Sequence, residues 1–294
     1  MPGGIVTTRV REKWVERPLA VARFPRWPET SKMNDVNCRE AGALEASTMS
    51  VATTRTDPAT SATPADCNGA IPPLESGDRL TRVEFERRYD AMPHVKKAEL
   101  VEGVVYMPSP VRQKYHGGPQ LRFNVWVGLY LVRTPGLDGG DDSTVRLDPI
   151  NEPQPDCVMF IEPEHGGRVV IDEEGHINDA PDLVGEVAAS SASYDVHDKL
   201  AVYQRHGVRE YIVWRVFDRE VDWYVLSGTK YQKLAAGDDG VLRSTIFPGL
   251  WLDSAALLRK DYDTVLAVLQ RGMETPEYAA FKAELQRARN EPAG

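Results

Sequence analysis

Two acidic residues stand in apolar runs that have the length and composition of buried strands. Asp156 opens the run PDCVMFI, and Glu186 lies inside the run PDLVGEV. A carboxylate in such a place is costly to bury unless a cation or a hydrogen-bond donor compensates it. Lys199, on the amphipathic segment that follows, supplies an ammonium group. Two carboxylates and a lysine brought together make a site for a hard metal ion and a phosphate group.

This constellation suits hydrolysis at phosphorus. Carboxylates on two neighbouring strands can share one Mg²⁺ or Mn²⁺ ion, which keeps several waters and readily binds phosphate. The metal lowers the pKa of a bound water, and Lys199 can orient that water or stabilise charge on the phosphate. The alternatives stay open at this point: a strand-end cap for Asp156, a surface acid for Glu186, and a solvated lysine paired with Asp195.

The elements that must position these residues alternate between helices and strands. Residues 98–110 predict a hairpin around Glu102 and Gly103, and the stretch that ends near Arg133 predicts a helix. The remaining segments are strands at 144–148, 155–162, 182–189 and 210–217, a meander over 221–247, and helices at 81–89, 195–206, 254–271 and 275–290. This order predicts an α/β fold, a mixed sheet flanked by helices.

Periodicity predicts which side chains share a face. Alternation along 182–189 places three residues on one side of the sheet: Val184, Glu186 and Ala188. In the helix that ends near Arg133, four residues fall at helical spacing and predict its buried face: Leu121, Val125, Leu129 and Val132. The connection between the two acid-bearing strands has no helical period, which favours a hairpin with a long loop.

Composition predicts three regions. Residues 1–75 read as a disordered N-terminal tail, because 46–70 are rich in Ala, Ser, Thr and Pro and hold few large apolar side chains. Residues 76–253 form the predicted folded domain, and 254–294 the C-terminal helices. The sequence contains no run of about 18 apolar residues, so we expect no transmembrane helix. Three widely separated cysteines argue against a disulfide framework or a zinc knuckle and fit a reducing cytoplasm.

The net charge and the remaining polar residues argue against several classes of function. The net charge of −9 is not the footprint of a protein that coats nucleic acid. Arg112, Lys114 and Arg122 could contact a phosphate backbone, but a solvated surface around the start of a helix is the simpler interpretation. His165 and His176 lie in a loop without a zinc-ligand pattern. The serines at 190, 191 and 193 lack the G-x-S-x-G elbow of a nucleophile and are expected to shape a turn.

Three stretches resemble the Uma-two family of restriction endonucleases, a branch of the PD-(D/E)XK nuclease superfamily. They are AELVEGVVYMPSP, PDCVMFI and PDLVGEVAASSASYDVHDKLAVYQRHGVREYIVW, and the resemblance covers about residues 78–250. It implies a restriction-endonuclease-like core and metal-dependent cleavage of phosphodiester bonds in DNA. On that resemblance Asp156 and Glu186 are metal ligands, Glu99 joins them from the first hairpin, and His116 contacts the phosphate or the metal's water.

One position departs from the superfamily pattern. The lysine that normally stands two residues after the second acid is replaced by Ala188, and the resemblance points to Lys199 on the following helix instead. A catalytically inert member of the fold, acting as a binding or regulatory module, is therefore a second hypothesis. A phosphohydrolase for small nucleotides is a third, although no phosphate-binding glycine loop is present. Cutting both strands of DNA with one site per chain favours a homodimer.

Overall fold

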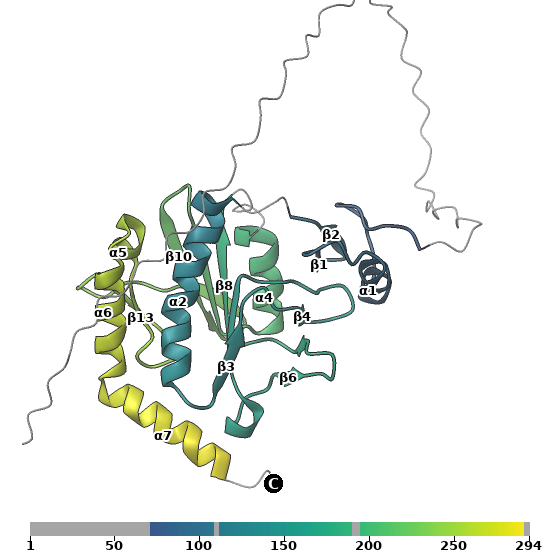
Figure 1. Cartoon of the computed structure of the whole chain (residues 1–294). Helices are drawn as coiled ribbons and strands as arrows, with labels where there is room; N and C mark the ends of the chain where they lie inside the picture. The colour runs from purple at the N-terminus through teal and green to yellow at the C-terminus, as the bar shows by residue number, and fades with distance from the viewer. Residues whose placement is uncertain (1–70, 109–111, 190–194, 291–294) are drawn as a thin grey trace, which may run out of the picture. The chain divides into compact units, whose positions relative to one another are not determined.

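A mixed sheet of six strands carries the largest hydrophobic core (Figure 1). In spatial order the strands are β11 Lys230–Lys233, β10 Glu220–Ser227, β9 Glu210–Arg215, β8 Leu183–Ala188, β5 Cys157–Ile161 and β3 Leu137–Gly140. The structure is a computed structural model that describes residues 71–108, 112–189 and 195–290. Most of the predicted tail and the serines at 190, 191 and 193 lie outside these residues, and the domain boundaries stay a prediction.

The sheet is antiparallel except at its centre, where β8 and β9 run parallel. The chain crosses between these two strands through a π-helical turn, η3 (Asp195–Lys199), and helix α4 (Leu200–His206). Strands β5 and β8 form the expected antiparallel pair. The excursion between them contains η2 (Pro163–His165), β6 (Val170–Ile171) and β7 (Ile177–Asn178), and the last two join β4 (Val145–Arg146) in a small sheet. The predicted mixed sheet with flanking helices is confirmed.

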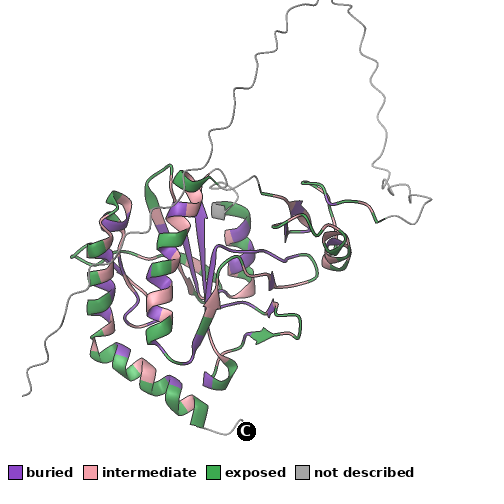
Figure 2. Cartoon of the chain, viewed as in Figure 1, coloured by how far each residue is buried: buried purple, intermediate pink, exposed green. Residues whose placement is uncertain are grey.

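Helices cover both faces of the sheet. Leu183 and Val187 of β8 belong to the cluster that includes helix α2 (Gly118–Arg133). Val184 and Ala188 belong to a second cluster, together with Tyr203 of α4. Strand β8 is therefore buried along its whole length, as the purple central strands in Figure 2 show. This division confirms the predicted alternation, and it places Glu186 on the α4 side of the sheet.

The predicted buried face of α2 is wrong. Leu121, Val125 and Val132 are 63%, 46% and 70% exposed, and of the four predicted residues Leu129 alone packs, partly buried, against the core. The buried side chains are instead Phe123, Trp126, Val127 and Tyr130. Aromatic rings remove more apolar surface from water than Leu or Val, so the aromatic stripe determines the orientation of the helix.

Two specific contacts of α2 reinforce this orientation. The indole Nε1 of Trp126 donates a hydrogen bond to the carbonyl oxygen of Trp251 at 3.0 Å. The ring of Phe123 lies directly on Gly185 of β8, where a Cβ atom would stand 2.3 Å from the nearest ring carbon. A glycine in the centre of a buried strand thus makes room for an aromatic ring from the covering helix.

A small hairpin unit precedes the main sheet. Strands β1 (Glu99–Val101) and β2 (Val104–Tyr106) form the predicted hairpin, and helix α1 (Arg82–Asp90) packs against them. Both turn residues, Glu102 and Gly103, have positive φ, as a two-residue hairpin turn of this kind requires. The backbones of Leu100 and Glu152 exchange hydrogen bonds of 3.1 and 2.7 Å, which fixes the hairpin to the segment that leads into β5.

The C-terminal part differs in detail from the prediction. Strand β12 (Val241–Arg243) leaves the predicted meander and pairs with β13 (Trp251–Asp253). The predicted helix 254–271 is two helices, because Lys260 adopts a left-handed conformation between α5 (Ser254–Arg259) and α6 (Tyr262–Met273). Helix α7 (Pro276–Asn290) ends the described chain. Within the described ranges, no helix combines the length and apolarity needed to cross a bilayer.

Candidate active site

Strand register brings Asp156 and Glu186 to the same place. Cys157 pairs with Gly185 in the antiparallel β5–β8 ladder, so one step further Asp156 stands opposite Glu186. Directly opposed residues of an antiparallel pair project from the same face. The carboxylate Oδ2 of Asp156 accepts a hydrogen bond of 2.8 Å from the backbone N–H of Val187. Both acids are buried, at 2% and 3% exposure, so neither is an ordinary surface acid.

Lys199 joins two carboxylates from different elements. Its Nζ lies 2.8 Å from Oε1 of Glu186 on β8 and 2.8 Å from Oε1 of Glu99 on β1. The same Glu99 oxygen accepts a hydrogen bond of 2.7 Å from the backbone N–H of Gln154, and Tyr203 donates one of 3.3 Å to Glu186. Lys199 is 3% exposed, which excludes a solvated lysine. Buried charges of this kind persist only when they are paired.

A second lysine, Lys97, was not predicted. Its Nζ lies 2.7 Å from Oδ1 of Asp142 and 3.5 Å from Oδ1 of Asp156. Burial on its own lowers the pKa of Lys97, but the carboxylates of Glu99, Asp156 and Glu186 outweigh burial and raise that pKa above its usual range. Lys97 stands before β1, outside any strand, so no periodicity in the sequence singled it out.

His116 approaches the site from a π-helical turn, η1 (Gln113–Gly117), at the start of α2. Its Nε2 lies 3.3 Å from Oδ2 of Asp156. The hydrogen bond to Asp156 raises the pKa of His116. Burial acts to raise the pKa of Asp156, yet the hydrogen bond from His116 and the charge of Lys97 prevail and lower it. Both shifts favour an imidazolium paired with a carboxylate.

The structure therefore brings together all five residues that the sequence singled out: Glu99, His116, Asp156, Glu186 and Lys199. Three buried carboxylates face two lysines, so the donor set suits a hard divalent cation, which prefers carboxylate oxygen. The ligand atoms of Glu99, Asp156 and Glu186 do not all lie within 4.8 Å of one another. Lys199 Nζ stands between two of these acids and contacts both.

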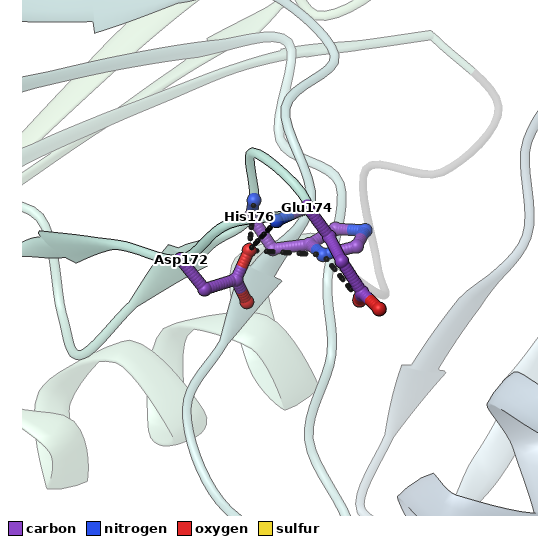
Figure 3. Close-up of side chains that lie close together, drawn as sticks. All are labelled: Asp172, Glu174 and His176. Atoms are coloured by element: carbon purple, nitrogen blue, oxygen red, sulfur yellow. Dashed lines mark hydrogen bonds and ion pairs between the residues drawn. The ribbon is translucent and has the colours of Figure 1, made fainter.

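A different trio has that mutual spacing among the described residues: Asp172, Glu174 and His176, in the β6–β7 turn (Figure 3). Asp172 Oδ1 accepts hydrogen bonds from the backbone N–H groups of Glu174 and His176, at 3.1 and 2.9 Å. Its Oδ2 accepts one of 2.7 Å from Arg146. These contacts are those of a side chain that closes a turn and is neutralised by an arginine, so we assign the trio a structural role.

Comparisons with known proteins point to one family. Residues 83–255 match the model of the Uma2 family, described as "Putative restriction endonuclease". This match includes all five predicted site residues and covers more than half of the chain. No curated protein matches.

Among solved structures, one match is a crystal structure from Anabaena variabilis described as "a putative nuclease belonging to DUF820". The two chains are 17% identical over 59% of this chain and 96% of that one, with a TM-score of 0.46. The extent of the family match shows that this chain is a member of the Uma2 restriction endonuclease family.

Proposed function

We propose that this protein is a divalent-metal-dependent endonuclease that hydrolyses phosphodiester bonds in DNA. Membership of a nuclease family supports the reaction class. The observation that carries the proposal is the placement of Asp156 opposite Glu186, with Lys199 Nζ 2.8 Å from Glu186. Carboxylates from two paired strands and an ammonium group then meet at one point of a buried sheet.

Each residue has a role that its surroundings support. Glu99, Asp156 and Glu186 would hold Mg²⁺ or Mn²⁺ through their oxygens. The bound ion would supply a water of lowered pKa and neutralise phosphate charge. The buried Lys199 and the half-buried Lys97 would place ammonium groups where negative charge grows on the phosphate.

His116 and Ala188 bear on the same chemistry. The imidazole of His116, held 3.3 Å from Asp156, is positioned to carry a proton to or from the reacting group. Ala188 lies on the Glu186 face of β8, where the superfamily lysine would stand. Lys199 reaches the Glu186 carboxylate from η3 instead, which supports the view that the lysine has moved to the helix.

One observation favours the inert binding module as the second candidate. Lys199 contacts both Glu99 and Glu186, and Lys97 contacts Asp156, so the site is largely neutralised by its own lysines. A site that needs no metal for charge balance can serve a structural purpose.

Plasmid cleavage separates the two candidates. Purified protein is incubated with plasmid and Mg²⁺ or Mn²⁺, beside Asp156→Asn and a matched buried control, Asp182→Asn. Asp182 is also buried, and it accepts a hydrogen bond from the backbone of Ile161 away from the lysines. We expect cleavage by wild type and by the Asp182 variant, and none by the Asp156 variant. Cleavage that survives Asp156→Asn, or no cleavage and no metal binding by calorimetry, contradicts the proposal.

Substrate class, assembly and location belong to the same proposal. Mono- and dinucleotides tested beside plasmid distinguish a nuclease from a nucleotide phosphohydrolase. We propose a homodimer, because double-strand cleavage with one site per chain needs two copies; light scattering with and without a duplex tests it. We also propose a cytoplasmic location, which the three separated cysteines support.

A further inference from the structure

A hollow of about 660 Å³ on the α2 side of the sheet is lined by several basic side chains. It is bordered by η1, the start of α2, the end of β9 with its following turn, and the α5–α6 junction. Five of its lining residues are cationic: Lys114, Arg122, Arg219, Arg259 and Lys260. No carboxylate is present among the described residues that line it. In a chain of net charge −9 this basic groove is a local exception, and it matches a polyanion.

The basic groove also exposes aromatic rings. Phe217 is 58% exposed, and its ring lies 4.9 Å from that of Tyr115. On the other side the guanidinium of Arg122 lies over the ring of Tyr262 at 5.0 Å. Exposure of an apolar phenylalanine ring to water is unfavourable, and an exposed aromatic ring beside cations is a surface on which nucleic-acid bases stack.

The basic groove and the candidate site share an element. Lys114 and Tyr115 line the groove and belong to η1, and so does His116, which lies 3.3 Å from Asp156. Lys114 therefore lies two positions, and Tyr115 one position, before a side chain of the candidate site. The sequence alone favoured a solvated surface for Lys114 and Arg122, because the aromatic partners come from segments about 100 and 140 residues further along.

We propose that the basic groove binds a single-stranded segment of the DNA substrate, next to the phosphate that is cleaved. This inference rests on the proposed nuclease function and refines its substrate class. Duplex DNA keeps its base faces stacked inside the helix, so they could not stack on the exposed ring of Phe217 or on the half-buried ring of Tyr115. A single strand offers phosphates to the cations of the groove, of which Arg259 already contacts Asp261 at 3.2 Å, and unstacked bases to the rings. Substrates with overhangs, flaps or melted regions follow from this arrangement.

Equilibrium binding in EDTA tests the inference without requiring cleavage. Fluorescence anisotropy is measured for full-length protein with a labelled oligothymidine and with a duplex of the same length, over a salt series. The test variant is Lys114→Glu with Arg219→Glu. The control is Lys230→Glu with Arg271→Glu, which changes the net charge equally at exposed positions outside the basic groove. Arg219 and Lys230 flank opposite ends of β10.

We expect wild type to bind the single strand at least tenfold more tightly than the duplex. The groove variant should bind the single strand about tenfold or more weakly than wild type. The slope of log affinity against log salt concentration should become shallower by about 1.4, since each phosphate contact with a single strand contributes about 0.7. The control should change affinity less than threefold. Phe217→Ala, at an exposed position that leaves the core intact, should also lose about fivefold or more.

The outcomes separate this inference from the proposed function. Equal losses in the groove and control variants, or a duplex preference unaffected by Phe217→Ala, overturn the groove even if plasmid is cleaved. A tenfold preference for RNA of the same sequence also overturns it. Selective single-strand binding through these residues supports the groove, and it does so even where the plasmid assay shows no cleavage.

Discussion

Removal of the buried ammonium group of Lys199 should destabilise the protein strongly, and a divalent ion should reverse the loss. Lys199→Met keeps the length of the side chain and leaves Glu99 and Glu186 as buried carboxylates without their shared cation. Breaking a buried ion pair by removing one partner costs about 3–5 kcal/mol. For a folded unit of this size, that loss lowers Tm by about 6–20 °C.

Thermal and urea unfolding in EDTA, and then in Mg²⁺ or Mn²⁺, measure the effect. The ion should raise the Tm of Lys199→Met more than that of wild type, because in the variant the ion replaces the ammonium group in neutralising the carboxylates of Glu99 and Glu186. The double variant with Glu186→Gln should recover part of the loss in EDTA. Lys230→Met, at an exposed position, serves as control. A change in stability within about 0.5 kcal/mol for Lys199→Met, the size of an ordinary surface effect, would refute the reasoning.

Three further predictions concern the scaffold. Burial and the neighbouring Glu86 carboxyl raise the pKa of Glu152 from 4.5 to about 8. Between these two pKa values the folded state holds a proton that the unfolded chain has released, so the free energy of unfolding falls as pH rises. Glu152→Gln should therefore have a free energy of unfolding about 2–4 kcal/mol higher than wild type at pH 9 and little changed at pH 4.5, as measured by urea unfolding. Gly185→Ala should cost about 1–3 kcal/mol because its Cβ overlaps the Phe123 ring, whereas Gly128→Ala, with open space in α2, should be neutral or stabilising. Burial raises the pKa of the Cys157 thiol, so iodoacetamide should label this residue only in denaturant, as peptide mass spectrometry can verify; labelling of the native protein at equal rate would contradict its burial.

Strand periodicity carried much of the prediction of the site. An acid inside a buried strand has a face determined by alternation alone, and Val184 and Ala188 confirm the face of Glu186. The antiparallel pairing of β5 with β8 followed from the lack of a helix between them, and it places Asp156 opposite. Geometry of this kind is local, so a single sequence contains it. The catalytic roles of these residues stay predictions.

The parts of the structure that the sequence did not predict depend on contacts between residues that are distant in sequence. The face of α2 depends on which residues find partners across the sheet, and Phe123 and Trp126 meet Gly185 and Trp251, which are distant in sequence. Lys97 was missed for the same reason, because it belongs to the site only through Asp142 and Asp156, which are distant in sequence and close in space. A lysine in a charged segment carries no signal of burial by itself.

The charged groups of the candidate site lie on elements of unequal stability. Glu186 belongs to β8, which is hydrogen-bonded to a neighbour along both edges. His116 and Lys199 sit on short π-helical turns, and Lys97 precedes the edge of a two-stranded hairpin. Amides in a doubly flanked strand exchange with solvent only when the whole fold opens, whereas short turns open on their own. On warming, Glu186 should therefore hold its place, whereas the basic groups, and Glu99 on the two-stranded hairpin, should move first.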